Sequence, residues 1–163
     1  MSTKSAMKAF IFLAFALCLL TSALAQMPNP YGPPISLENA KKVAAPALAE
    51  ATKNNWTMAV AVVDPGGNLV YYEKMDNTQI GSATVAIDKA RSAALFKRPT
   101  KAFQDALAAG GDGLRILRVQ GAVPVEGGFP LVMDGKIVGA IGVSGGTSAQ
   151  DAQCAKAGAD VLK

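Results

Sequence analysis

Histidine is absent from all 163 residues of this chain. Without an imidazole, Ser-His-Asp and Cys-His catalysis, histidine general-base chemistry and imidazole metal ligation are excluded. The chain must therefore recognise a partner through shape, backbone groups and fixed charges. This absence favours a binding protein without catalysis of its own over an enzyme.

The first 25 residues have the features of a signal peptide. Lys4 and Lys8 precede an apolar run over residues 9–20, and Ala23-Leu24-Ala25 supplies the small residues of a cleavage site. The run is shorter than the ~20 apolar residues of a comfortable membrane span. We therefore expect export to the periplasm or full secretion, with no stable membrane span after cleavage. A retained N-terminal anchor is the alternative.

Removal of this segment changes the charge and the cysteine content of the chain. The net charge falls from +4 to +2, because two lysines and no acidic residues are lost. No Lys/Arg cluster with interleaved aromatic residues occurs elsewhere, so no nucleic-acid partner is expected. Cys154 is then the only cysteine, so stability must come from packing or from oligomerisation instead of an internal disulfide.

The remaining chain is interpreted as a proline-rich tether over residues 26–35 and a single domain over residues 36–163. Ser36 is placed to cap a helix over residues 37–51, and Pro46 is expected to kink it. Two strand-turn-strand patterns predict antiparallel hairpins. Their strands run over 56–64 and 69–75 around Pro65-Gly66-Gly67-Asn68, and over 129–133 and 136–143 around Asp134-Gly135.

Helical patterns occupy the sequence between and after the hairpins. The central helix covers residues 82–96 and stops at Pro99, after which Thr100 is predicted to cap a shorter helix through Ala109. Ser148 is predicted to cap the last helix, with Asp151 completing an approximate capping box. Residues 114–125 have no clear period and are predicted to form a loop with a short helix or strand.

This order of elements indicates an α+β domain with a mostly antiparallel sheet and helices packed on it. A parallel doubly wound sheet is the alternative for strands that alternate with helices. The two turn dipeptides argue against it, because tight turns cannot join parallel neighbours.

One motif resembles a catalytic signature. Gly142-Val-Ser-Gly-Gly146 matches the G-x-S-x-G nucleophile elbow and lies between a strand and a helix. No histidine is present to activate Ser144, so we interpret it as a glycine-rich turn. Its backbone N–H groups would suit an anion at a helix N-terminus, but plain helix capping is the simpler interpretation.

The candidate ligand-binding residues lie on and around the central helix. Its alanines make it thin, so that another backbone or a flat ligand can lie close against it. Cations could meet ligand carboxylates, aromatic rings could cover a flat ligand, and paired glycines could admit it closely. The cations are Lys89, Arg91 and Arg98, the aromatic residues are Phe96, Tyr71 and Tyr72, and the glycines are Gly127 and Gly128. For the cations, a solvated surface position is the alternative.

Iron ligation is a separate question for a chain without histidine. Met and Tyr are known haem ligand types, which makes Met75 and Met133 candidates for an axial position. Both methionines fall on predicted strands, where packing in the core is the alternative.

Three stretches together resemble the GlcG/HbpS family of small haem-binding proteins, which is related to the C-terminal domain of PduO-type corrinoid proteins. The likeness covers about residues 36–162. The stretches are Ala59-Val-Ala-Val-Val-Asp-Pro-Gly-Gly-Asn-Leu-Val70, residues 87–100 with their Lys-Ala-Arg and Arg-Pro-Thr, and Gly127-Gly-Phe-Pro130 with residues 139–144 and Ser148-Ala-Gln-Asp151.

This resemblance implies an α+β domain similar to profilin- or PAS-like modules, with a central antiparallel sheet of about five strands. It also implies a homo-oligomer, and haem as a ligand of some exported members. A haem-degrading activity is attributed to part of the family. Family members use a histidine for haem, and this chain has none.

We therefore expect an exported, oligomeric binding protein for a small, flat, acidic ligand, with haem or another tetrapyrrole as the first candidate. Its role would be that of a carrier or a sensor accessory. Two alternatives stay open: an enzyme that modifies haem or a corrinoid, and a structural oligomerisation module with no small ligand.

Overall fold

The computed structural model describes residues 29–162, so the predicted signal peptide lies outside the described residues. No helix within residues 29–162 has the length and apolarity needed to cross a membrane. The elements, in chain order, are α2 (Leu37–Lys53), β1 (Ala59–Val63), β2 (Leu69–Lys74), α3 (Ser82–Leu95), α4 (Lys101–Ala108), the 3-10 helix η1 (Gly111–Arg118), β3 (Gly128–Met133), β4 (Lys136–Ser144), α5 (Ser148–Ala159) and the 3-10 turn η2 (Asp160–Leu162).

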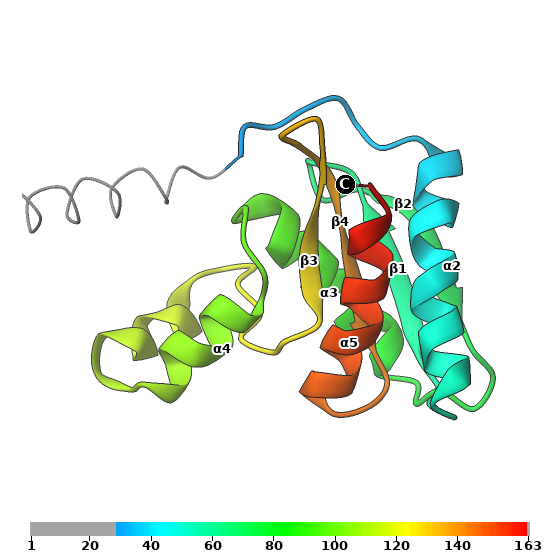
Figure 1. Cartoon of the computed structure of the whole chain (residues 1–163). Coiled ribbons are helices and arrows are strands. Elements are labelled where there is room, and N and C mark those ends of the chain that lie inside the picture. The colour runs from blue at the N-terminus through cyan, green and yellow to red at the C-terminus, as the bar shows by residue number, and fades with distance from the viewer. Residues whose placement is uncertain (1–28, 163) are drawn as a thin grey trace, which may run out of the picture.

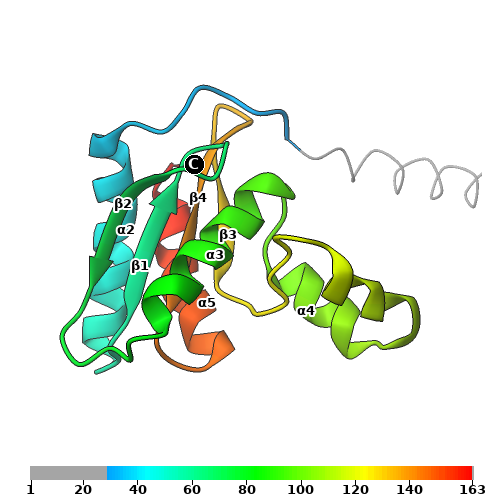
Figure 2. The ribbon, with the colours of Figure 1, turned by 180° about the vertical axis from the view of Figure 1, so that it is seen from behind.

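The four strands form one antiparallel sheet in the order β2-β1-β4-β3. Helix α3 covers one face of this sheet, whereas α2 and α5 lie side by side on the other face (Figures 1 and 2). The structure therefore confirms the predicted α+β fold with both hairpins. The sheet has four strands where about five were expected.

The two tight turns follow from their residues. Asp134 and Gly135 have φ of 51° and 71°, the positive values that a two-residue type I′ hairpin requires. At the first hairpin, the Asp64 carboxylate accepts a hydrogen bond from the Asn68 N–H, and Gly67 has φ of 81°. Both hairpins were predictable because their turn chemistry is local.

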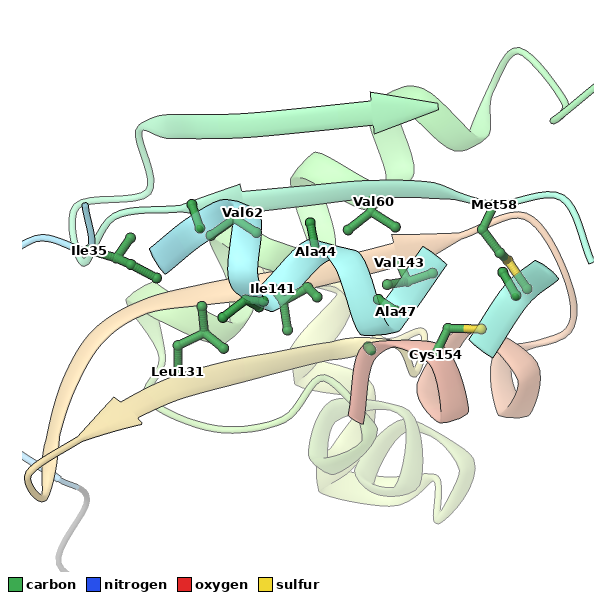
Figure 3. Packing of buried hydrophobic residues seen from close by; sticks show 14 of the residues in the cluster. Ile35, Ala44, Ala47, Met58, Val60, Val62, Leu131, Ile141, Val143 and Cys154 are labelled. Atoms are coloured by element: carbon green, nitrogen blue, oxygen red, sulfur yellow. The ribbon is translucent and has the colours of Figure 1, made fainter. Parts of the chain in front are cut away.

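Alternate side chains of the central strands supply two separate cores. Val60, Val62, Ile141 and Val143 point towards α2 and α5 and join the larger cluster, which also contains Cys154 (Figure 3). The other face of β1 contributes only the small side chains Ala59, Ala61 and Val63 to the cluster under α3. All five residues of β1 are consequently buried.

Small residues on both partners let α3 lie directly on the sheet. Its buried face consists largely of alanines, namely Ala86, Ala90, Ala93 and Ala94. Opposite them, Gly142 of β4 is so close that a Cβ there would lie 2.1 Å from the Ala86 carbonyl oxygen and 2.5 Å from the Ala90 nitrogen. The expectation that another backbone approaches this helix is thus met by the chain's own sheet.

The segment predicted to form a loop with a short helix or strand contains η1, so the helical alternative is correct and adds no fifth strand to the sheet. Residues 111–118 form a 3-10 helix, which completes one turn in three residues. That period aligns Leu114 with Leu117 and Arg115 with Arg118. Two glycines with positive φ mark the turn from α4 into this helix, Gly110 before it and Gly111 as its first residue.

Two predicted helix caps are wrong. The Thr100 hydroxyl does not cap α4 but accepts a hydrogen bond from the Gly128 N–H at 3.0 Å. Helix α5 is capped by Thr147 instead of Ser148, with Gln150 completing the capping box. Adjacent Thr and Ser both suit an N-cap, and so the local pattern does not choose between them.

The proline-rich segment is fastened to the domain from residue 30 onwards, so it is not a free tether there. The Gly32 N–H donates to the Ile137 carbonyl, the Ile35 N–H donates to the Val138 carbonyl, and Ile137 donates back to Pro30. Ile35 is 5% exposed and belongs to the larger core. The folded unit therefore begins before Ser36.

We predict that Gly142→Ala destabilises the protein by about 3 kcal/mol or more, because the new methyl group meets helix backbone that cannot move independently. Gly81→Ala is the matched control, since a Cβ at Gly81 has no neighbour within 4 Å. Urea unfolding of both variants measures the difference. Equal stability of the two variants would contradict the close packing described for α3.

A second prediction concerns Cys154, which is fully buried. Burial, assisted by the charges of Glu50 and Asp151, raises the pKa of this thiol from 9.0 to about 11. Because the folded pKa is the higher one, the stabilisation is complete below pH 9 and is lost as the pH rises towards 11. In a chain beginning at Gln26, unfolding free energy should fall by about 2 kcal/mol more between pH 7.5 and 10.5 than in Cys154→Ala. If the unfolding free energies of the two proteins changed equally with pH, the raised pKa of Cys154 would be refuted.

Candidate functional site

The most deeply buried charge in the described chain belongs to Lys89 of α3. Its side chain is 0% exposed, and its Nζ donates to Asp151 Oδ2 at 2.6 Å and to the Val143 carbonyl at 3.1 Å. Helix α3 and helix α5 lie on opposite faces of the sheet, so this ion pair joins the two layers. Lys89 is therefore neither a solvated surface residue nor exposed to a ligand in this arrangement.

Gly127 and Gly128 make room for this ion pair. A Cβ at Gly127 would lie 2.9 Å from Lys89 Nζ, and one at Gly128 would lie 2.4 Å from the Lys89 carbonyl oxygen. Gly127 also has φ of 122°, a conformation that residues with a side chain rarely adopt. The close approach predicted at these glycines is thus made by the same chain, by α3 at both positions and also by β4 and α5 at Gly127.

The Asp151 carboxylate also contacts the glycine-rich turn after β4, where the sequence suggested room for an anion. Its Oδ1 accepts a hydrogen bond from the Gly146 N–H at 3.0 Å. The anion at this turn is therefore the chain's own carboxylate. Ser144, the residue in the nucleophile position of the false elbow, is buried with its hydroxyl 3.4 Å from that of Ser82.

Burial dominates the electrostatics of the pair. It lowers the pKa of Lys89, an effect that the Asp151 carboxylate opposes, and it raises the pKa of Asp151 against the hydrogen bonds from Lys89 and Gly146. A proton-transfer pair must reach its substrate, and these two side chains are sealed from solvent. The arrangement supports a structural role.

Arg91, two residues further along α3, contacts the first hairpin. Its Nε donates to the Gly67 carbonyl at 3.0 Å, and its guanidinium lies 3.9 Å from the Asp88 carboxylate. About half of the Arg91 side chain is exposed. It fastens the β1–β2 turn to α3 and keeps one face open to solvent.

The C-terminal end of α3 brings together two of the predicted ligand residues. Phe96 packs edge-to-face against Phe103 of α4, with the ring centroids 5.3 Å apart. The Arg98 guanidinium lies 5.6 Å from the Phe103 ring centroid, and its Nε donates to the Phe96 carbonyl. Arg98 and the neighbouring Leu95 are exposed, so the surface combines apolar and cationic groups.

Four residues at the same end are absent from the predicted ligand set, namely Tyr31, Leu95, Lys97 and Phe103. The Tyr31 hydroxyl donates to the carbonyl oxygens of Ala94 and Leu95, and Lys97 Nζ lies 4.2 Å from the Tyr31 ring centroid. The sequence places Tyr31 in the predicted tether, where a single aromatic residue among prolines is only a weak signal. We call the group Tyr31, Leu95, Phe96, Lys97, Arg98 and Phe103 the α3-end cluster.

The two strand tyrosines do not belong to the α3-end cluster. Tyr71 packs against the larger core and its hydroxyl donates to Glu73, whereas Tyr72 packs against the core under α3. They point to opposite faces of β2, as their alternation in the sequence predicts. Of the predicted set, only Phe96 and Arg98 are brought into one surface.

The sulfur candidates for iron ligation lie against the core. Met75 and Met133 are half-buried and pack on the larger cluster, in agreement with the core alternative. Within residues 29–162, no three or more His, Cys, Asp or Glu side chains gather to hold a metal ion.

Comparison with known proteins identifies the relationship. Residues 35–160 match the family described as haem degrading protein HbpS-like. The chain belongs to the HbpS-like family. It is 42% identical to GlcG of Escherichia coli strain K12 over 110 residues, which are 68% of this chain and 81% of GlcG. It is 36% identical to an uncharacterized 15.0 kDa protein of Citrobacter freundii over 128 residues, 77% of this chain and 90% of that protein.

Solved structures agree with this membership and with the fold. A double mutant of HbpS from Streptomyces reticuli superposes with a TM-score of 0.74 at 32% identity, covering 81% of this chain and 89% of that one. The PduOC:heme complex gives a TM-score of 0.70 at 25% identity, covering 78% of this chain and 94% of its own. The resemblance to GlcG/HbpS proteins is therefore confirmed.

We predict that Lys89→Met costs about 3–5 kcal/mol, because it leaves the Asp151 carboxylate buried without its cation. Lys89→Met/Asp151→Asn should recover most of that loss, since the amide oxygen can still accept from Gly146. Lys101→Met removes an exposed pair with Asp105 and should change stability by less than about 1 kcal/mol. Urea unfolding ranks the three variants. A double variant no more stable than Lys89→Met would contradict the assigned ion pair.

Proposed function

We propose that the protein binds haem or a closely related tetrapyrrole at the α3-end cluster. The observation that carries the proposal is the exposed apolar and cationic surface at this helix end, in a member of a family described by haem chemistry. A haem has a flat apolar ring with two carboxylates at one edge. The likeness to the PduOC:heme complex supports the same ligand class.

The residues of the cluster suit the two parts of such a ligand. Leu95 and Phe96 offer apolar surface for the ring, while Lys97 and Arg98 offer charges for the carboxylates. Tyr31 supplies a phenol oxygen at the same end, and tyrosine is one of the haem ligand types. A bound haem would supply the iron and its redox chemistry.

A carrier or sensor accessory fits this chain better than an enzyme. General acid–base catalysis needs a titratable side chain within reach of the substrate. Within the described residues, the buried acid–base pair of Lys89 and Asp151 is closed to solvent and committed to the fold. The protein would then contribute binding and orientation, and any iron chemistry would belong to the haem.

We further propose that the protein is exported, with cleavage after Ala25, and that it works as a homo-oligomer in the periplasm or the medium. The basic start, the apolar run and the small residues at 23 and 25 support export. Exposed apolar side chains on the domain support assembly.

Hemin titration of a chain beginning at Gln26 tests the ligand. We expect a shift of the Soret band on binding, and about tenfold weaker affinity in Lys97→Glu and in Arg98→Glu, since each would repel a carboxylate. Lys41→Glu makes the same charge change at an exposed position of α2 and should bind as the unaltered chain does. Tyr31→Phe should alter the visible spectrum of the bound haem.

Three outcomes would count against parts of this proposal. Absence of a Soret shift removes the tetrapyrrole. Equal weakening by Lys41→Glu removes the α3-end cluster as the site, because the effect would then follow net charge alone. Conversion of bound haem to product under a reductant, by the unaltered chain alone, would favour the enzymatic alternative over a carrier.

A further inference from the structure

A helical arm projects from the body of the protein beside α3. It comprises residues 101–125, that is α4, η1 and the segment that returns to β3, and it stands apart from the sheet in both ribbon views (Figures 1 and 2). The two helices of the arm touch closely, because a Cβ at Gly113 would lie 1.8 Å from the Ala106 carbonyl oxygen. The arm is therefore a packed helical hairpin with a defined shape.

The root of the arm is fixed to the domain. The Val123 N–H donates to the Ser92 hydroxyl of α3, and the Glu126 N–H donates to the side-chain oxygen of Gln104. Phe103 is buried at this root, where it meets Phe96. The arm is thus held in position before any partner binds.

The outer part of the arm leaves its apolar side chains in water. No residue of η1 is buried, and Leu117 is 64% exposed, with Leu114 and Val119 also exposed. Eight residues are long for a 3-10 helix, whose hydrogen bonds are weaker than those of an α-helix. Burial of these side chains against a partner would stabilise both the helix and the assembly.

The same chain carries a surface of complementary character at the start of α3. Ile80, in the turn before the helix, is 91% exposed, and Val85 on the first turns of α3 is also exposed. Acidic residues flank these apolar side chains, Asp76 ahead of Ile80 and Asp88 one helical turn after Val85. On the arm, Arg118 carries the opposite charge beside Leu117, whereas Arg115 is already paired with Asp112 of η1 at 2.8 Å.

We propose that η1 of the arm docks on the start of α3 in a second copy of the same chain. Leu114 and Leu117 would cover Ile80 and Val85, and Arg118 would pair with Asp88. Because each copy has both surfaces, a two-fold arrangement uses each surface twice and closes the assembly. This inference rests on the proposed homo-oligomer, for which it names the surface, and it is independent of haem.

Light scattering after size-exclusion chromatography tests the docking, with the chain that begins at Gln26. We expect a dimer or a larger closed assembly, and dissociation to monomers in Leu117→Glu, with association weakened at least tenfold. Leu37→Glu is the matched control, since Leu37 is a similarly exposed leucine on α2, away from both surfaces. Circular dichroism shows whether each variant keeps its fold.

A charge exchange tests the pairing of the two surfaces. Arg118→Glu and Asp88→Arg should each weaken association, and the double variant should restore it, because the two charges are then again opposite across the interface. Arg118 and Asp88 lie on different surfaces of the chain. Restoration by the double variant is therefore expected only when the partner is a second copy that carries both substitutions.

The outcomes separate the two levels of the proposal. A monomeric unaltered chain would refute the homo-oligomer itself, whatever the hemin titration shows. An oligomer that persists in Leu117→Glu would refute the arm as the interface and leave the oligomer standing. Loss of the oligomer in Leu117→Glu without restoration in the double variant would refute α3 as the surface that receives the arm.

Discussion

The structure depends on one ion pair that joins its two helical layers. Lys89 on α3 and Asp151 on α5 meet beside the end of β4, although 62 residues separate them in the chain. A buried charge without its partner is costly, so neither side chain is tolerable until both helices are seated on the sheet. The pair therefore couples helix packing on one face to helix packing on the other.

This ion pair explains why two glycines and a threonine surround it, namely Gly127, Gly128 and Thr100. Gly127 and Gly128 have no room for a Cβ, because Lys89 and its neighbours Val143, Asp151 and Thr100 fill the space. Thr100 then pairs with Gly128 through its backbone N–H and its hydroxyl, and so returns the chain after α3 to the sheet. The stretches that carry the family resemblance thus contribute much of the internal framework, and the α3-end cluster lies just outside it.

Local chemistry explains which parts of the fold were predictable. The Asp134-Gly135 hairpin, the Ser36 cap and the span of α3 are set by residues within a few positions of one another. The role of Lys89 was not predictable from its neighbours in the sequence, because its partner lies in another layer. The position of Asp151 is also typical of a helix cap. Tyr31 escaped notice for a similar reason: its contacts to the end of α3 span 63 and 64 residues.

The alanine contact between α3 and the sheet has a consequence for ligand binding. Because mostly alanine methyl groups and Gly142 separate the two backbones, the helix has little freedom to rotate or slide. Its C-terminal end, and the aromatic and charged groups attached there, would consequently be held in one orientation before a ligand arrives. Such preorganisation would spare a complex the entropic penalty of ordering the receptor, and it would let a small domain without a metal-binding imidazole hold the flat ligand proposed for it.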